Sequence, residues 1–138
     1  MAKVLVVDDE PDILLMLRMS FEDEGHEVVM AADGRMGLER LAEYQPDVVV
    51  LDMMMPVVDG WGVLEAMSVQ GNRTPVIVVS AKSDPRDCSR ALELGAVEYV
   101  MKPFDLDRLL ELVTAVAAED AAAHDERRRL ALEMQQGQ

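Results

Sequence analysis

The sequence predicts one α/β domain built on a doubly wound, five-stranded parallel sheet. Five strand-length apolar blocks recur along the chain, and longer stretches with helical spacing separate them. The blocks cover residues 4–7, 27–31, 47–51, 75–79 and 97–101. Three of the blocks are unbroken apolar runs, as expected for strands that helices cover on both faces. Strict alternation with short connections favours right-handed crossovers, so helices should lie on both faces of the sheet.

Apolar residues at helical spacing predict a helix after each strand. The first helix should begin at Pro11, a residue suited to the first turn, and end before Gly25. Asp33 is a candidate cap for the second helix. The apolar stripes of the five helices include Leu17, Leu41, Leu64, Leu92 and Leu109.

The last twenty residues differ in composition from the rest of the chain. They are rich in Ala, and Asp125 and Arg129 stand four positions apart, which favours a helix. We expect residues 1–118 to form the main domain and residues 119–138 to form a helical extension or linker. Leu130 and Met134 are its only well-spaced apolar anchors, so it is either a frayed terminal helix or a continuation of the fifth helix that links or dimerises.

Composition limits the partners and the compartment of this domain. The 138 residues carry 27 acidic and 13 basic side chains, a formal net charge of −14, which makes direct nucleic-acid binding improbable. The single Cys88 cannot form an internal disulfide and fits a reducing cytosol. No apolar run approaches the roughly 20 residues of a membrane span, and the N-terminus is no secretory signal. We expect a cytoplasmic domain without a membrane partner.

Charged and hydroxyl side chains follow four of the five predicted strands. In an open α/β sheet, function collects outside the carboxyl ends of the strands, so these side chains should share one rim. Each has an ordinary structural explanation when taken alone, such as capping a helix or completing a turn. Together they indicate a functional site. They are Asp8, Asp9 and Glu10 after the first strand, Asp52 after the third, Ser80 after the fourth and Lys102 after the fifth.

Charge balance suggests the chemistry of this rim. Two carboxylates about 4 Å apart repel by roughly 4 kcal/mol at an effective dielectric of 20, so a third requires protonation or a cation. An all-oxygen cluster suits Mg²⁺, and a carboxylate beside the ion can attack an activated phosphoryl group. Asp52 is central and is the better nucleophile, whereas Asp8 and Asp9 are the better metal ligands. Lys102 and Ser80 would contact the phosphoryl oxygens.

Four stretches of the chain together carry a family resemblance. They are residues 6–10 (VVDDE), 51–60 (LDMMMPVVDG), 79–81 (VSA) and 99–104 (YVMKPF). In this order and at these spacings, the chain resembles the receiver domains of two-component response regulators over residue 3 to about residue 118. The resemblance implies a flavodoxin-like fold with strand order 2-1-3-4-5.

The resemblance also implies roles for the rim residues. Asp52 would accept a phosphoryl group from a phosphohistidine on a sensor histidine kinase or a histidine phosphotransfer protein. Mg²⁺, or Mn²⁺, would be held by Asp8, Asp9, Asp52 and the backbone carbonyl of Met54. Lys102 would bind the phosphoryl group.

Further implied features concern the switch and two backbone positions. Ser80 and Tyr99 would be the switch pair, in which the hydroxyl moves toward the phosphate and the aromatic ring turns inward. The Lys102–Pro103 bond should be cis, and Gly60 should stand where the loop needs a positive φ.

The expected readout is the surface of the fourth helix, fifth strand and fifth helix, which would control a partner or a fused output and can mediate homodimers. The domain would catalyse only its own phosphotransfer and autodephosphorylation. Apolar Met54, and Lys82 at the mouth of the site, could tune the loss of the phosphoryl group, although the run of methionines around Met54 could equally be loop packing. No output domain follows residue 118, so we expect a stand-alone regulator or one part of a longer protein.

Two other functions are compatible with parts of this pattern. An aspartate-nucleophile phosphatase of the haloacid-dehalogenase type also combines Mg²⁺, a hydroxyl and a lysine. That class needs a second Asp two residues after the nucleophile, where this chain has Met54. The other alternative is an interaction module on the same fold that is never phosphorylated.

Overall fold

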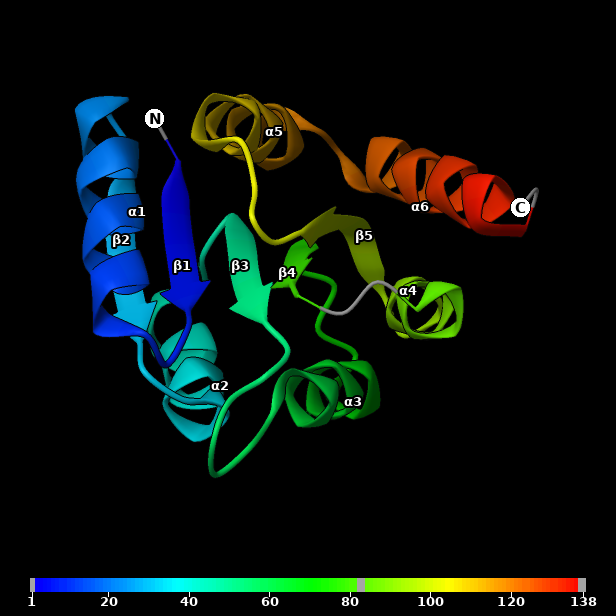
Figure 1. Ribbon diagram of the computed structural model, residues 1–138, viewed down its shortest axis with the longest axis horizontal. Coiled ribbons are helices and arrows are strands. Elements are labelled where there is room, and N and C mark those ends of the chain that lie inside the picture. The colour runs from blue at the N-terminus through cyan, green and yellow to red at the C-terminus, as the bar shows by residue number, and fades with distance from the viewer. Residues whose placement is uncertain (1, 82–83, 137–138) are drawn as a thin grey trace.

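The computed structural model describes residues 2–81 and 84–136 of the chain. Within these two ranges, five strands and six helices follow one another in strict alternation until the last two helices (Figure 1). The strands are β1 (Lys3–Val7), β2 (Glu27–Ala31), β3 (Val48–Asp52), β4 (Val76–Ser80) and β5 (Ala96–Met101). The helices are α1 (Pro11–Asp23), α2 (Gly34–Tyr44), α3 (Gly60–Gln70), α4 (Pro85–Glu93), α5 (Leu106–Ala118) and α6 (Ala121–Gln136).

The five strands form one parallel sheet in the order β2-β1-β3-β4-β5. This confirms the predicted fold class and strand order, and each apolar block matches its strand to within one residue at either end. The central strands β1, β3 and β4 are buried almost throughout, which is why their sequences show no polar alternation.

Helices cover both faces of the sheet. α1 and α5 pack on one face through Leu17, Phe21, Leu109 and Val113. α2, α3 and α4 pack on the other face, where they form a second core cluster with the strands (Figure 1). The predicted cap of α2 is present, because an Asp33 side-chain oxygen accepts a hydrogen bond from the backbone N–H of Met36 at 2.8 Å.

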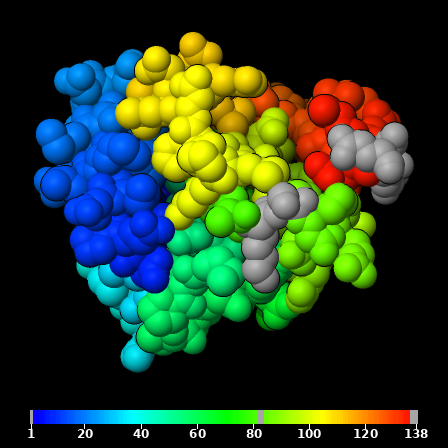
Figure 2. Space-filling model, in the orientation of Figure 1, coloured from blue at the N-terminus to red at the C-terminus, as the bar shows by residue number. Residues whose placement is uncertain are grey.

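Parallel pairing places the carboxyl ends of β1 and β3 side by side at one rim. Val7 lies opposite Leu51 in the register, so the residues that follow each strand are also neighbours. β4 and β5 end at the same rim with Ser80 opposite Met101. Figure 2 shows the segments after β1, β3 and β5, in blue, green and yellow, adjoining on one face of the molecule.

Close backbone contacts, and not the expected positive φ, explain Gly60 in the loop between β3 and α3. The prediction for Gly60 was wrong, since φ is positive at Gly25, Gly71 and Gly95 and at the non-glycine residues Gln45 and Val57. A Cβ on Gly60 would lie 2.6 Å from the Cα of Met53, so the glycine allows the loop to fold back on β3.

Val57 is the strained residue of this loop. Its φ is 69°, in the left-handed region that costs an L-residue about 1–2 kcal/mol, and its side chain is exposed. The following residue is anchored, because the backbone N–H of Gly34 donates to the carbonyl of Val58 at 3.1 Å. A tertiary contact therefore holds the loop in a conformation that a β-branched residue disfavours.

The end of the chain forms a separate helix and is not a continuation of α5. Glu119 has extended backbone angles, which stop α5, and the side chain of Asp120 accepts a hydrogen bond from the N–H of Ala123 at 2.9 Å. The proposed anchors are also wrong, because Leu130 and Met134 are exposed on α6. Neither residues 2–81 nor 84–136 contain a helix with the length and apolar character needed to cross a membrane.

Candidate functional site

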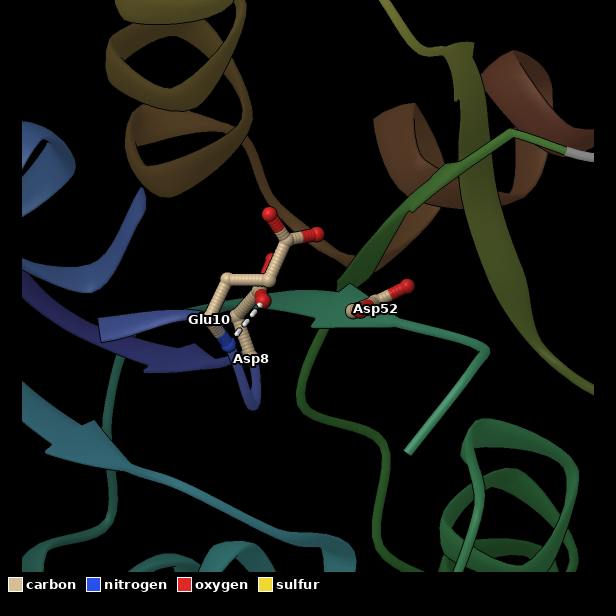
Figure 3. Close-up of side chains that lie close together, drawn as sticks. All are labelled: Asp8, Glu10 and Asp52. Atoms are coloured by element: carbon tan, nitrogen blue, oxygen red, sulfur yellow. Dashed lines mark hydrogen bonds between the residues drawn. The ribbon is translucent and has the colours of Figure 1, made fainter. Parts of the chain in front are cut away.

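Three carboxylates meet at the rim where β1 and β3 end (Figure 3). Asp8 follows β1, Glu10 precedes α1, and Asp52 is the last residue of β3. One oxygen from each lies within 4.8 Å of the others. Asp8 and Asp52 are buried, whereas Glu10 lies at the surface. The sheet thus brings together acidic residues that are more than forty positions apart in the sequence.

Lys102 reaches all three of these carboxylates from the loop after β5. Its Nζ lies 3.2 Å from Asp8 Oδ2, 3.5 Å from Glu10 Oε1 and 3.6 Å from Asp52 Oδ2. The backbone N–H of Lys102 donates to the carbonyl of Ser80 at 2.8 Å, which fixes the start of the loop against β4. The Lys102–Pro103 bond is cis, as expected.

Backbone amides orient the two buried carboxylates. The N–H of Glu10 donates to Asp8 Oδ1 at 2.9 Å, and the N–H of Met54 donates to Asp52 Oδ1 at 3.2 Å. In both residues the second oxygen, Oδ2, is the one nearer to Lys102. Each carboxylate therefore has one oxygen held by the backbone and the other directed into the site.

Burial raises the pKa of both buried carboxyls above the ordinary value of an aspartate. For Asp52 the neighbouring charges of Asp8 and Asp9 act in the same direction, while the Met54 amide and Lys102 oppose them. For Asp8 the Glu10 amide and Lys102 only partly offset the burial. Burial would lower the pKa of Lys102, but the charges of Asp8 and Asp52 outweigh it and raise that pKa.

The donor set of this site fits a hard divalent cation. Its ligands are all oxygens, and one ammonium faces three carboxylates, which leaves an excess of negative charge. Burial is the main cause of the raised pKa values of Asp8 and Asp52, and it makes their negative charge costly, so a bound cation would stabilise both carboxylates. Carboxylate-rich sites of this kind suit Mg²⁺, which prefers oxygen ligands.

Of the other predicted site residues, Asp9 and Met54 are not among the three clustered carboxylates. Asp9 is exposed and lies outside the cluster of three, although its charge contributes to the raised pKa of Asp52, so its role as a ligand stays a prediction. Met54, two residues after Asp52 in the loop that follows β3, has an exposed side chain. Lys82 lies outside the described residues. Glu10 was recognised in the sequence as a rim carboxylate but not as a member of the cluster; its place in the run Asp8-Asp9-Glu10 was the available signal.

Ser80, the last residue of β4, lies beside Tyr99 of the neighbouring strand β5. Ser80 is fully buried, and Tyr99 is half-buried against the core cluster on the α4 side of the sheet. Burial raises the pKa of the Tyr99 phenol, and a side-chain hydrogen bond with Ser80 acts against that rise. The expected switch residues are thus in contact at the end of β4.

Comparison with known proteins assigns the family. The family described as the response regulator receiver domain matches residues 4–114, which is most of the chain and includes all of the rim residues. The chain therefore belongs to the response regulator receiver domains of two-component systems.

Particular relatives agree with this assignment. The transcriptional regulatory protein KdpE of Mycobacterium tuberculosis is 43% identical over 89% of this chain and 54% of its own length. The transcriptional regulatory protein PrrA of the same species is 43% identical over 83% of this chain and 49% of its own length. The chain thus spans about half the length of these curated relatives.

Solved structures support the same conclusion. The receiver domain of the Francisella response regulator 1452 superposes with a TM-score of 0.82 at 34% identity, over 85% of this chain and 97% of that one. The chemotaxis protein CheY4 of Vibrio cholerae superposes with a TM-score of 0.78 at 34% identity, over 84% and 98% of the two chains. Receiver domains of response regulators, as a family, interact with histidine kinases.

Replacing Asp52 by Asn should stabilise the protein in the absence of divalent ions. The pKa of Asp52 is higher in the folded than in the unfolded protein, so folding favours the protonated carboxyl. As the pH rises through the folded-state pKa, Asp52 loses its proton and the free energy of unfolding falls. At pH 7 the buried carboxylate therefore destabilises the folded protein. Asn keeps an acceptor for the Met54 amide. We expect a gain of about 1 kcal/mol, or about 3–5 °C in Tm, at pH 7.

Thermal denaturation at several pH values checks this expectation. The difference in Tm between Asp52→Asn and the wild type should narrow as the pH falls toward 4. Added Mg²⁺ should raise the Tm of the wild type more than that of the variant. If the variant has a lower Tm than the wild type at pH 7, and if this difference in Tm does not change with pH, the buried charge of Asp52 does not destabilise the protein.

Proposed function

We propose that Asp52 is the phosphoacceptor of this receiver domain. The observation that supports this most directly is the position of Asp52, buried at the end of central strand β3 with Oδ2 facing Lys102. An Asp52 oxygen would attack the phosphorus of a phosphohistidine. A P–O bond forms, the P–N bond breaks, and the imidazole leaves with the electron pair and takes up a proton.

The neighbouring residues prepare Asp52 for this attack. Asp8, Asp9, Asp52 and the backbone carbonyl of Met54 would hold Mg²⁺, or Mn²⁺ in its place. When bound, the ion neutralises charge on the carboxylates and on the phosphoryl oxygens. The Met54 amide orients the Asp52 carboxylate through Oδ1, so that the second oxygen is available to react.

Lys102 and Ser80 would stabilise the transferred group. The Lys102 ammonium already lies between Asp8 and Asp52 and would contact a phosphoryl oxygen once Asp52 is modified. Ser80, at the end of β4, would donate a hydrogen bond to another oxygen. To make that hydrogen bond, the Ser80 hydroxyl would move toward the phosphoryl group. Its contact with Tyr99 would then change, and the Tyr99 ring would turn further inward.

The change would be read on the surface formed by α4, β5 and α5. Tyr99 lies in β5 and interacts with Cys88 of α4 as well as with Ser80, so its movement links the phosphoryl site to both elements. In this account phosphorylation biases an equilibrium between two conformations and turns over no outside substrate apart from the phosphoryl donor. Homodimerisation through this surface, or control of a fused output, is the proposed result.

The proposed phosphoryl donor is a histidine kinase or a histidine phosphotransfer protein, and α1 offers it a contact surface. The side chains of Leu15, Met16 and Met19 are 54%, 37% and 62% exposed on α1, whose first turn adjoins the acidic rim. Such a patch suits an apolar partner surface. We place the domain in the cytoplasm without direct nucleic-acid contact, in keeping with its single Cys88 and its net charge of −14.

The chemistry of the loop also argues against phosphatase activity on outside substrates. An aspartate-nucleophile phosphatase needs an acid two residues after the nucleophile, and Met54 cannot supply a proton. The family found for this chain is that of the receiver domains. We therefore restrict its reactions to its own phosphorylation and the hydrolysis of its own phosphoryl group.

Incubation with acetyl phosphate and Mg²⁺, followed by intact-mass spectrometry, tests the phosphoacceptor. We expect an increase of about 80 Da, the mass of one phosphoryl group, that is absent from Asp52→Asn. Glu43→Gln, which changes an exposed carboxylate on α2 by the same chemistry, is the matched control and should be modified like the wild type. Equal modification of Asp52→Asn would refute the assignment, and a wild type that is never modified would favour the unphosphorylated interaction module.

Met54→Asn should shorten the lifetime of the phosphoryl group. The Met54 side chain is exposed beside Asp52 and is apolar, so it would hinder the approach of water, whereas Asn can hydrogen-bond a water molecule. We expect hydrolysis to become about tenfold faster, measured as the decay of the phosphorylated mass after removal of the donor. Val69→Asn, on the exposed face of α3, should leave the rate unchanged. An unaltered rate in Met54→Asn would assign the methionine to loop packing.

A further inference from the structure

Helix α6 lies against α4 and the open edge of the sheet. Among the residues that the structure describes, β5 pairs only with β4, so its other edge would face solvent without α6. Figure 1 shows α6 returning beside β5 and α4, and Figure 2 shows it next to α4 on the surface. The helix thus covers two of the three elements that make up the proposed output surface.

Arg127 ties α6 to β5 by a contact between distant parts of the sequence. Its guanidinium donates to Glu98 of β5 at 2.9 Å and to both carboxylate oxygens of Glu119 at 2.6 and 2.9 Å. About a quarter of each of these three side chains is exposed. The hydrogen bond from Arg127 lowers the pKa of Glu119, in keeping with a close charged pair.

Arg128 binds the edge of β5 through the backbone. Its Nη2 donates to the carbonyl of Gly95 at 2.9 Å and its Nε to the carbonyl of Ala96 at 3.2 Å. Arg129, the next residue, points to solvent and pairs only within α6, with Glu126 and Glu133, among the described residues. Three consecutive arginines therefore have different roles, and two of them fasten the helix to the domain.

The apolar part of this contact is small. Ala131 and Leu132 are partly buried against the core cluster that includes Leu92 of α4 and Ala96 of β5. An isolated helix of this length is marginally stable in water, so α6 depends on its contacts with the domain. Loss of the two arginine contacts should therefore release the helix.

Release of α6 would expose an edge that favours self-association. β5 is the short segment Ala96–Met101, with five apolar or aromatic residues and one charge, Glu98. An uncovered strand of this kind is a template for pairing with another chain. The adjoining helix α4 carries both signs of charge, with Arg90 and Glu93, so two copies related by a twofold axis can form reciprocal contacts.

We propose that α6 is an intramolecular cover of the α4–β5 face, and that this face binds a second copy of the chain only after α6 is released. The inference deepens the homodimer put forward above and rests on it. In that proposal phosphorylation favours the dimer. The variants below expose the same face without phosphorylation, so the test needs no phosphoryl donor. A failure of this test leaves the phosphoacceptor chemistry of Asp52 unaffected.

The test compares full-length variants that differ by two arginines. Arg127→Ala combined with Arg128→Ala removes the contacts to Glu98, Gly95 and Ala96. The matched control combines Arg129→Ala with Arg35→Ala, which changes the net charge equally but removes only exposed pairs within helices. Circular dichroism verifies that both variants retain the fold.

Two measurements are made on each protein in about 0.15 M salt, where repulsion between the acidic copies is screened. The first is the rate of cleavage after Glu126 and Glu133 by a glutamate-specific protease. The second is the molar mass by light scattering over a concentration series. The Arg127/Arg128 variant should be cut about tenfold faster and should approach twice the 15.3 kDa monomer, while the wild type and the control stay monomeric.

Several results would overturn the proposal. They are a wild type that is already dimeric, a variant whose α6 is cut no faster than that of the wild type, and a variant that is cut faster but stays monomeric. Adding Glu98→Arg to the released variant must change its dimer affinity, since an unaltered affinity would place the dimer elsewhere. If the arginine variant fails to fold, Leu132→Ser, which weakens the same contact through its apolar part, takes its place with the same expected and contradicting results.

Discussion

The contact of Lys102 with the buried carboxylates of Asp8 and Asp52 is the interaction on which the site depends. Three carboxylates within 4.8 Å of one another would repel strongly without a cation among them. One ammonium facing three carboxylates reduces this repulsion but leaves negative charge, and burial makes that charge costly, which raises the pKa of both aspartates. A divalent ion bound among these carboxylates would offset the remaining charge, and in the proposed function it would allow a dianionic phosphoryl group to enter the acidic site.

The fold imposes this arrangement through its central strands. Because β1 and β3 are parallel neighbours, Asp8 and Asp52 end side by side, and burial of both strands holds them there. β4 and β5 end at the same rim, which adds Ser80 and Lys102. The edge strand β5 also carries Tyr99 and Glu98, so the proposed phosphoryl site and the docking contact of α6 share one element. A change in the position of β5 can therefore reach the surface that α6 covers.

Local patterns predicted most of the fold and of the site, whereas contacts between distant segments were not predictable. Unbroken apolar runs such as residues 48–51 marked the buried strands, and strand ends located Asp52 and Lys102. The close approach of Gly60 to Met53 depends on how the loop folds back, so its cause was misjudged. Arg127 points toward the domain because it pairs with Glu98 of β5, which is far away in the sequence. Asp120 caps α6, and the Ala-rich sequence after it did not indicate where that helix begins.

Calorimetric titration of the unphosphorylated protein with Mg²⁺ shows whether Lys102 and a divalent ion compete for the carboxylates of the rim. If Lys102 and the ion neutralise the same carboxylates, Lys102→Ala should bind Mg²⁺ about tenfold more tightly than the wild type. Asp52→Asn should bind it more weakly, since it loses a ligand and a charge. An affinity in Lys102→Ala equal to or weaker than that of the wild type would contradict the account, because the lysine and the ion would then not share these oxygens.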